Sequence, residues 1–152
     1  MIEKKILEMG INLPVAVAPV ANYLSCRVVG GVLYVSGQLP FEAGKVKYTG
    51  KVTKENVNQA QEAARLCVIN ALAQVVASVN GGLGSIKSVI KLGVFVNSEG
   101  DFDQHSAVAN GASDLVVKIF GETGKHVRAA VGMSSLPLNA MVEVEFMFEI
   151  YE

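Results

Sequence analysis

The chain has 152 residues, of which 51% are hydrophobic and 18% charged, and its formal net charge is −1 at pH 7. This length suits one domain that buries about 68–70% of its unfolded surface. The sequence contains no basic cluster or stripe of Lys and Arg, which argues against nucleic acid as a partner. No apolar run reaches the roughly 18 residues of a membrane span, so we expect no membrane segment or membrane partner.

The apolar composition predicts a large subunit interface instead, because obligate interfaces resemble a hydrophobic core cut in half. The mean hydropathy of +0.38 is high for a small soluble domain. The N-terminus carries no signal-peptide pattern, and Cys26 and Cys67 are too few for a disulfide framework. We therefore expect a cytoplasmic oligomer.

The pattern at the N-terminus predicts a lead-in over residues 1–22, followed by a single domain over residues 23–152. The stretch from Ile2 to Leu7 can form a short amphipathic turn, and Pro14 and Pro19 then enforce an extended chain.

Three short β-like runs open the predicted domain. Cys26–Val29 and Val32–Ser36 flank the pair Gly30-Gly31, and a glycine pair between apolar runs predicts a hairpin. The run Lys45–Thr49 predicts a short edge strand.

The clearest helix is predicted over residues 57–75, where apolar side chains recur at spacings of three and four. Thr53 is predicted to cap this helix at its N-terminus. The pair Gly81-Gly82 is predicted to end it.

A strand is predicted over Ser88–Val96, with alternate residues from Ile90 onward sharing one face by period two. The polar stretch Asn97–Ser106 predicts a loop. A second helix is predicted over residues 107–120, because glycines follow its apolar pattern.

The last two strands are predicted over Val127–Met133 and Met141–Tyr151. In the final strand, Val142 and every second residue after it form an apolar face, and Glu143 belongs to the opposite face. The order β-β-(β)-α-β-α-β-β predicts an α+β fold: a mixed sheet with two helices on one face.

Arg128 and Glu143 each stand inside an apolar, strand-forming run, where a charge needs a partner. They can form a structural ion pair that joins two strands or two subunits. They can also form a site, with Arg128 binding a small carboxylate and Glu143 handling protons or water. The residues alone leave both open, although structural pairs are commoner. We expect both side chains, with Tyr34 and Ser36, on the sheet face opposite the helices, at a subunit interface.

Other chemistry has less support in the sequence. His105 and His126 are far apart, and the stretch 101–105 lacks zinc or calcium spacing, so no metal is expected. Cys67 lies on the apolar helix face, which predicts a packed thiol rather than a nucleophile. The sequence lacks phosphate-loop and dinucleotide motifs, so no cofactor is expected.

Four short motifs, in the expected order, resemble one family. They are S-G-Q-L-P at Ser36–Pro40, V-F-V at Val94–Val96, R-x-x-V-x-x-x-x-L-P at Arg128–Pro137 and V-E-V at Val142–Val144. The chain resembles the reactive intermediate deaminase family, the YjgF-type proteins once called perchloric-acid-soluble endoribonucleases. The resemblance covers Tyr23 to Glu149. It implies a chorismate-mutase-like fold and a homotrimer with ligand clefts between neighbouring subunits.

The resemblance also implies an activity: hydrolysis of enamines and imines, such as 2-aminoacrylate and 2-iminopropionate, to 2-keto acids and ammonia, without a cofactor. Arg128 falls on the family's carboxylate-binding arginine, a role that its planar guanidinium suits. Glu143 falls on the glutamate beside the attacking water, where a carboxylate can move protons.

Four further positions match residues that contact the ligand or the water in this family. Tyr23 and Ser36 would donate or accept hydrogen bonds there, and Gly37 would contribute its backbone. Asn110 matches a family asparagine at the ligand. Each also has a structural interpretation: an interface aromatic for Tyr23, a strand-end hydrogen bond for Ser36, and a helix cap for Asn110.

The chain departs from the family pattern at two places near the predicted cleft. Ala130 stands where a cysteine is common, so only its backbone carbonyl can serve a ligand. His126 stands where proline or alanine is usual and brings a titratable group to the cleft mouth. Two other functions therefore stay open: a trimer that binds small carboxylates without turnover and regulates a partner protein, and, with less support, an endoribonuclease.

Overall fold

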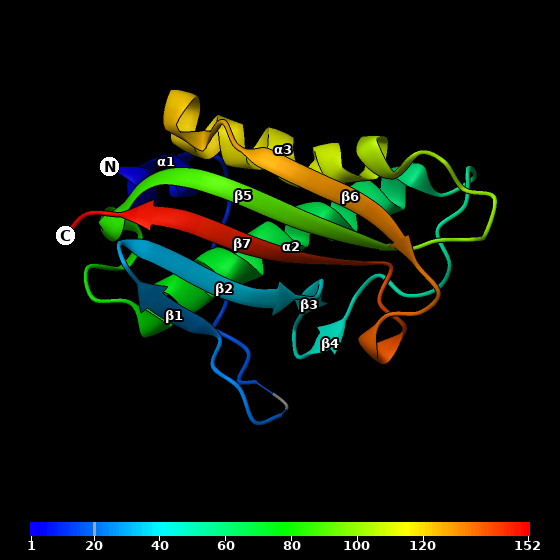
Figure 1. Cartoon of the computed structure of the whole chain (residues 1–152), viewed down its shortest axis with the longest axis horizontal. Helices are drawn as coiled ribbons and strands as arrows, with labels where there is room; N and C mark the ends of the chain where they lie inside the picture. Colours follow the sequence, from blue (N-terminus) through cyan, green and yellow to red (C-terminus); the bar gives the residue numbers. More distant parts are fainter. Residues whose placement is uncertain (20) are drawn as a thin grey trace.

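The chain folds into a five-stranded sheet whose helices lie on one face (Figure 1). This computed structural model describes residues 1–19 and 21–152. In chain order the elements are α1 (Ile2–Glu8), β1 (Cys26–Val29), β2 (Val32–Gln38), β3 (Phe41–Glu42), β4 (Lys45–Val46), α2 (Val57–Ser78), η1 (Gly82–Ser85), β5 (Ile86–Asn97), α3 (His105–Phe120), η2 (Gly121–Gly124), β6 (Val127–Met133), η3 (Pro137–Asn139) and β7 (Val142–Ile150).

The strands of the main sheet follow the spatial order β1-β2-β7-β5-β6. Neighbouring strands run antiparallel except β5 and β6, which are parallel and are connected through α3. We call the side against α2 and α3 the helix face and the other side, toward the viewer in Figure 1, the open face. The predicted α+β fold with a mixed sheet and helices on one face is confirmed.

The β1–β2 hairpin and the final strand are confirmed. Gly30 and Gly31 connect β1 to β2 with φ values of +56° and +77°, which a residue without a Cβ adopts at little cost. In β7 every second side chain from Val142 to Phe148 is buried against the helices, with exposed fractions of 2% or less. Because Glu143 alternates with these residues, it lies on the open face.

The predicted edge strand Lys45–Thr49 is wrong in length and in partner. Lys45–Val46 pairs with Phe41–Glu42 as a separate two-stranded sheet, β3–β4, rather than joining the main one. The tight turn at Ala43 and Gly44, where φ is positive at both residues, brings these strands together. Local sequence indicates a strand but does not indicate which edge it will join.

The predicted N-cap of α2 is also wrong. The helix begins at Val57 after Asn56, three residues beyond Thr53. The side chain of Asn56 points back along the chain, where its Oδ1 accepts a hydrogen bond of 2.8 Å from the Thr53 amide. Thr53 instead accepts a hydrogen bond from the Glu55 amide, a turn that competes with capping.

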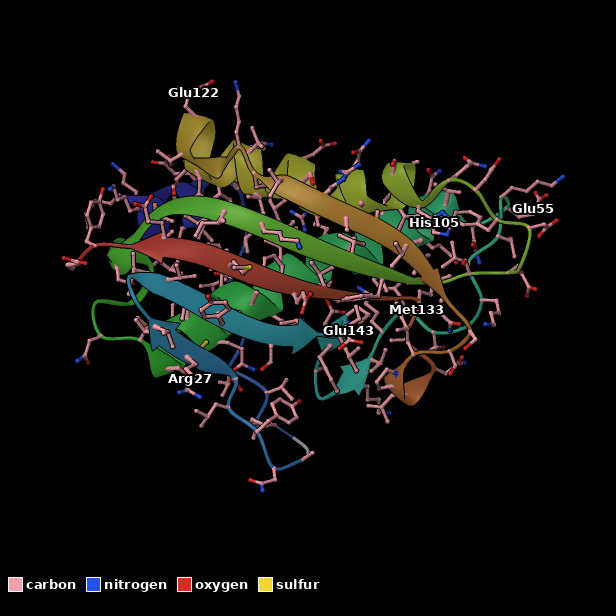
Figure 2. All side chains as sticks on the ribbon, viewed as in Figure 1. Arg27, Glu55, His105, Glu122, Met133 and Glu143 are labelled. Atoms are coloured by element: carbon pink, nitrogen blue, oxygen red, sulfur yellow. The ribbon has the colours of Figure 1, made fainter. Side chains whose placement is uncertain are left out.

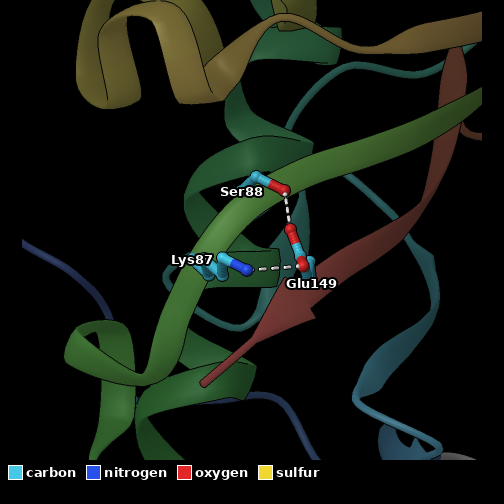
Figure 3. Close-up of polar contacts among 3 residues, drawn as sticks. All are labelled: Lys87, Ser88 and Glu149. Carbon is cyan, nitrogen blue, oxygen red and sulfur yellow. Dashed lines mark hydrogen bonds and ion pairs between the residues drawn. The ribbon is translucent and has the colours of Figure 1, made fainter. Parts of the chain in front are cut away.

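The predicted core face of β5 is displaced by an irregularity in its pairing with β7. The register shifts between Val89 and Lys91, so Val89 is buried (3% exposed) and Ile90 is not. A second shift, between Ile86 and Ser88, turns two consecutive side chains toward one acceptor. Figure 3 shows the result: Lys87 and Ser88 both donate to the Glu149 carboxylate, at 3.0 and 2.8 Å.

The predicted lead-in contributes to the core on the helix side. Ile6 of α1 and Ile11 after it are 2% and 5% exposed and belong to the same hydrophobic cluster as α2, α3 and the sheet. Across residues 1–19 and 21–152, none of the helices combines the length and the hydrophobicity that a bilayer crossing requires.

The two long helices approach most closely at Gly111 of α3. A Cβ at this position would overlap the backbone carbonyl of Gln61 in α2, only 2.7 Å from the carbonyl carbon. The neighbouring Ala112 and Ala60 are fully buried, so the crossing has no space to expand.

We therefore predict that Gly111→Ala lowers the free energy of unfolding by about 1–3 kcal/mol, although alanine is the better helix former. Urea denaturation measures the change. Gly84→Ala, where a Cβ meets nothing within 4 Å, is the control and should change stability by less than about 0.5 kcal/mol. An unchanged Gly111→Ala protein would contradict this view of the helix crossing.

Candidate functional site

The open face carries a cavity of about 610 Å³ that contains four of the predicted site residues. These are Tyr23, Ser36, Gly37 and Glu143. The rest of its wall is formed by Val17, Ala18, Pro19, Ser25, Gln38, Leu39, Phe41, Gln74, Pro137, Leu138 and Glu145. Segments far apart in the chain therefore meet around one carboxylate, and Figure 2 shows Glu143 near the end of β2 on the open face.

Gly37 makes the room that the Glu143 carboxylate occupies. A Cβ on Gly37 would overlap this carboxylate, at 2.9 Å from its Cδ atom. The ladder between β2 and β7 is irregular at the same place, between Val35 and Gln38. The bulge and the missing side chain together let the acid lie against the β2 backbone.

The Glu143 carboxylate is half-buried, and within residues 1–19 and 21–152 no side chain forms an ion pair or hydrogen bond with it. Burial raises the pKa of Glu143 above its ordinary value, and the charge of Glu145 raises it further. Such a carboxyl group exchanges protons closer to neutral pH than an exposed glutamate does, which suits general acid–base chemistry.

Ser36 and Tyr23 lie at the same cavity but differ in what they offer a ligand. The Ser36 hydroxyl donates to the Leu24 carbonyl oxygen at 2.6 Å, and its amide donates to the Ser25 carbonyl oxygen at 2.9 Å. Ser36 therefore holds the segment that carries Tyr23, and its oxygen can still accept a hydrogen bond. Tyr23 is 49% exposed, so its ring is accessible to a ligand or a second subunit.

The structure places Arg128 on the helix face, so the expectation that it shares a sheet face with Glu143 is wrong. Arg128 pairs with Leu92 across β5 and β6, and Leu92 is fully buried beneath the helices. Glu143 pairs with Phe95 instead. Leu92 and Phe95 are an odd number of residues apart, so their side chains and those of their partners point to opposite faces.

The Arg128 guanidinium is held against α3 by three hydrogen bonds. Nη1 donates to Asn110 Oδ1 at 2.8 Å and to Ser113 Oγ at 3.0 Å, and Nη2 donates to the Ser106 carbonyl oxygen at 3.1 Å. Of its five N–H groups, the Nε proton and one Nη2 proton have no acceptor among the described residues. Two adjacent donors of this kind can bind both oxygens of one carboxylate.

The two remaining predicted residues, Asn110 and Ala130, both lie on the side of Arg128 rather than at the Glu143 cavity. Asn110 lies at Arg128 as a hydrogen-bond acceptor. Ala130 lies two residues farther along β6, pairs with Val94 and packs its methyl group against the core. The sequence analysis did not predict Glu145 at the cavity or Ser113 at Arg128. The alternation in β7 could have indicated Glu145, because it places this residue on the same face as Glu143. No local sequence pattern indicates Ser113.

The charge of the Glu143 cavity bears on what it can bind. Among the described residues, its wall includes two carboxylates, Glu143 and Glu145, and no Lys, Arg or His side chain. An adjoining cavity of about 660 Å³ shares Tyr23, Ser36 and Glu145 with it and contains Arg27 and Lys91, but not Glu143. Within one protomer, an anionic ligand at Glu143 therefore has no cation in the same cavity.

The described part of the chain shows no candidate metal site, and its helix thiol, Cys67, is packed in the core. Residues 1–19 and 21–152 contain no cluster of three His, Cys, Asp or Glu side chains that could hold a metal ion. Cys67 is fully buried, and this burial raises the pKa of its thiol well above the ordinary value. It is therefore a packed thiol, as predicted.

The chain is similar to known proteins in both sequence and structure. The profile of the family described as "YjgF/chorismate mutase-like, putative endoribonuclease" matches residues 3–150. A crystal structure of a protein of unknown function from Agrobacterium tumefaciens is 50% identical, covers 99% of this chain and 92% of its own, and superposes with a TM-score of 0.90.

Two curated relatives also match over most of their length. Protein TCP17 of Trypanosoma cruzi is 45% identical over 144 residues, which are 93% of this chain and 89% of that protein. The 2-iminobutanoate/2-iminopropanoate deaminase of Dermatophagoides farinae is 28% identical over 135 residues, which are 89% of this chain and 91% of that protein.

The contact between Gly37 and Glu143 yields a stability prediction. Gly37→Ala should lower the free energy of unfolding by about 1–3 kcal/mol, because the new methyl group displaces the carboxylate. In a Glu143→Ala background the same change should cost at least about 0.5 kcal/mol less.

Urea denaturation of the four proteins at one protein concentration gives the coupling between the two positions. Gly93→Ala with Glu145→Ala is the matched second pair, since a Cβ on Gly93 would lie 2.8 Å from the Glu145 side chain. Additive effects of Gly37→Ala and Glu143→Ala would show that the two residues do not touch.

Proposed function

Since this chain belongs to the YjgF/chorismate mutase-like family, we propose that it hydrolyses small 2-imino acids and their enamine tautomers to 2-keto acids and ammonia. The family match confirms the resemblance predicted from four short motifs. The observation that supports the activity is a pair of complementary groups. Within the part of the chain that the structure describes, Glu143 is an unpaired, half-buried acid in a cavity without a cation, and Arg128 is a guanidinium held by three hydrogen bonds with two unused donors.

In the proposed reaction, Arg128 binds the substrate carboxylate through two parallel hydrogen bonds and so fixes the imine carbon near Glu143. The substrate reacts as its iminium form, in which the nitrogen has already taken a proton from solvent. The Glu143 carboxylate takes a proton from water while the water oxygen bonds to the iminium carbon, and the electron pair of the C=N bond moves to the nitrogen. In the carbinolamine that results, the C–N bond breaks as Glu143 returns its proton to the nitrogen, and ammonia leaves. The hydroxyl group then loses its proton to solvent, which completes the keto group.

The proposed site needs two protomers, because Arg128 and Glu143 lie on opposite faces of one sheet. If the β6 edge of one protomer contacts the open face of the next, Arg128 supplies the cation that the Glu143 cavity lacks. Such head-to-tail contacts close into a ring when the rotation permits, and the family resemblance implies a ring of three. Tyr34 on the open face and Val127 on β6, which are 43% and 65% exposed, support this interface.

The two other functions left open by the sequence meet different objections. RNA would bring several phosphates toward Glu143 and Glu145, and in the two-protomer site the one Arg128 side chain would have to face them all, which disfavours an endoribonuclease site there. Carboxylate binding without turnover would use the same Arg128 and differs only in the reaction at Glu143. The kinetic experiment below separates it from hydrolysis.

We predict that the wild-type protein removes 2-iminopropionate or 2-iminobutanoate generated by an L-amino-acid oxidase, measured as reduced formation of the semicarbazide adduct. Arg128→Lys should raise KM by roughly 10- to 100-fold, because one charge-assisted hydrogen bond of about 1.5–3 kcal/mol is lost. Glu143→Gln should lower kcat by roughly 100- to 10,000-fold. Arg27→Gln, a change to the exposed arginine of the adjoining cavity, is the matched control and should retain turnover.

Binding of 2-oxobutyrate without any effect on the semicarbazide adduct would favour the non-catalytic carboxylate binder. Normal kinetics in Arg128→Lys, together with loss of turnover in Arg27→Gln, would place the carboxylate within one protomer. That result would contradict the two-protomer site.

Mixing two inactive variants tests the shared site directly. Hybrids assembled from Arg128→Gln and Glu143→Gln subunits contain some interfaces with both native side chains, about a quarter of all sites for random head-to-tail assembly. Co-refolding should therefore restore about that fraction of wild-type activity. Mixing Glu143→Gln with Glu143→Ala, two changes in the same half of the site, should restore none, and equal recovery in both mixtures would exclude the arrangement.

A further inference from the structure

A polar stripe on α3 receives the side chain of Arg128. Ser106, Asn110 and Ser113 follow one another at spacings of four and three, which places them on one side of the helix. Ser106 offers its carbonyl oxygen to the guanidinium, and the other two offer side-chain oxygens. His126, directly before β6, reaches the same stripe at Ser113. One serine hydroxyl group therefore lies between Arg128 and a second side chain.

These contacts occupy the Nη1 end of the guanidinium completely. Nη1 carries two protons, and its two acceptors are Asn110 Oδ1 at 2.8 Å and Ser113 Oγ at 3.0 Å. One Nη2 proton goes to the Ser106 carbonyl oxygen. Among the described residues, the Nε proton and the second Nη2 proton have no acceptor. A carboxylate that forms two parallel hydrogen bonds must therefore approach the Nε–Nη2 edge.

Ser113 is in turn oriented by His126. Ser113 Oγ lies 2.8 Å from His126 Nε2, and Nδ1 of the same ring lies 2.7 Å from the Gly124 carbonyl oxygen. This carbonyl oxygen can only accept, so Nδ1 carries a proton, and in the neutral ring Nε2 is an acceptor. Ser113 then donates its one proton to His126 and accepts from Arg128 through a lone pair. Each hydrogen bond between the Gly124 backbone and the guanidinium thus has a defined direction.

Close packing fixes the far end of this series of hydrogen bonds. A Cβ on Gly124 would lie 2.8 Å from the Val116 carbonyl oxygen, so η2 rests directly on α3. The near end has a competitor, because a serine inside a helix can donate to the carbonyl oxygen four residues earlier, which here belongs to Ala109. By accepting the hydroxyl proton, His126 keeps the Ser113 oxygen turned toward Arg128.

We propose that Ser113 and His126 are positioning residues of the carboxylate site, which fix the rotation of the Arg128 guanidinium so that its Nε–Nη2 edge stays free for the ligand. The inference rests on the proposed function, in which Arg128 binds the substrate carboxylate. Ser113 acts through Arg128, and His126 acts through Ser113. A guanidinium held in this way loses less side-chain entropy when an anion binds, so the pair contributes to affinity rather than to the chemical step.

A purely structural role for the two residues predicts something different. The bond between Ser113 and His126 also ties α3 to the start of β6, so its loss would lower the free energy of unfolding whatever Arg128 does. Only a positioning role also changes the guanidinium and its affinity for an anion. His126→Gln and His126→Asn are a matched pair for this test. Glutamine can place its amide oxygen near the position of Nε2, whereas asparagine reaches only the position of Nδ1.

The first measurement needs no ligand. In ¹⁵N-labelled protein, the side-chain signals of Arg128 are assigned by their loss in Arg128→Lys. Because hydrogen bonds slow rotation about the Cζ–Nη1 bond, the two Nη1 proton signals should exchange about two- to tenfold faster in Ser113→Ala and His126→Asn. Ser113→Thr, which keeps the hydroxyl group, and His126→Gln should retain the wild-type rate. Ser98→Ala is the control, since Ser98 contacts the other histidine, His105, at 3.4 Å.

The second measurement adds sodium 2-oxobutyrate at one fixed pH. Binding to the wild-type protein should shift the Nε–H signal of Arg128, because this proton lies at the free edge. The Kd should rise about two- to tenfold in Ser113→Ala and His126→Asn and stay within about twofold in Ser113→Thr and His126→Gln. In turnover of 2-iminopropionate, KM should rise by the same factor while kcat stays within about twofold.

The two measurements separate the possible failures. If the exchange rate or the Kd is unchanged in Ser113→Ala and His126→Asn, the positioning role is wrong, whatever the stability of these variants in urea. Binding to the wild-type protein with a shifted Nε–H signal would still support the proposed role of Arg128. If 2-oxobutyrate does not bind, or binds without shifting that signal, the proposed function fails and the inference fails with it.

Discussion

The parallel pairing of β6 with β5 is the constraint on which the candidate site depends. Its register sets Arg128 beside Leu92 and therefore beneath α3, whereas the antiparallel partner β7 sets Glu143 beside Phe95 and therefore on the open face. A shift of one residue in either ladder would move every side chain of that strand to the other face. The register of the hydrogen bonds between the strands therefore decides that Glu143 and Arg128 lie on opposite faces of the sheet.

The surroundings of Glu143 raise the pKa of its carboxyl group, and the surroundings of Arg128 orient its guanidinium group. Glycine at position 37 lets the Glu143 carboxylate lie against backbone, where burial raises its pKa. The guanidinium of Arg128 is oriented by side chains of α3, so less rotamer entropy remains to be lost when an anion binds. Among the described residues neither half pairs with the opposite charge, and in the proposed two-protomer site each charge would meet its counterpart from the neighbouring protomer.

Close packing between α2 and α3 positions α3, and α3 in turn holds the side chain of Arg128. At Gly111 the backbones of α3 and α2 are in direct contact, which fixes the distance between these two helices and so helps to place Asn110 at Arg128. The bulges in β5 and β2 adjust which side chains face the helices without interrupting the sheet. The positions of the two polar groups are therefore a consequence of apolar packing on the helix face.

Local sequence predicts the elements and most of their faces: the predicted bounds of β6 are the observed ones, and the alternation in β7 places Glu143 opposite the core. These features depend on neighbouring residues and a fixed period. The tertiary structure alone decided the partner of β4, the bulge that buries Val89 and the face of Arg128. Strand partners and registers arise from contacts between distant segments, and a period of two assigns a residue to a face only after the register is known.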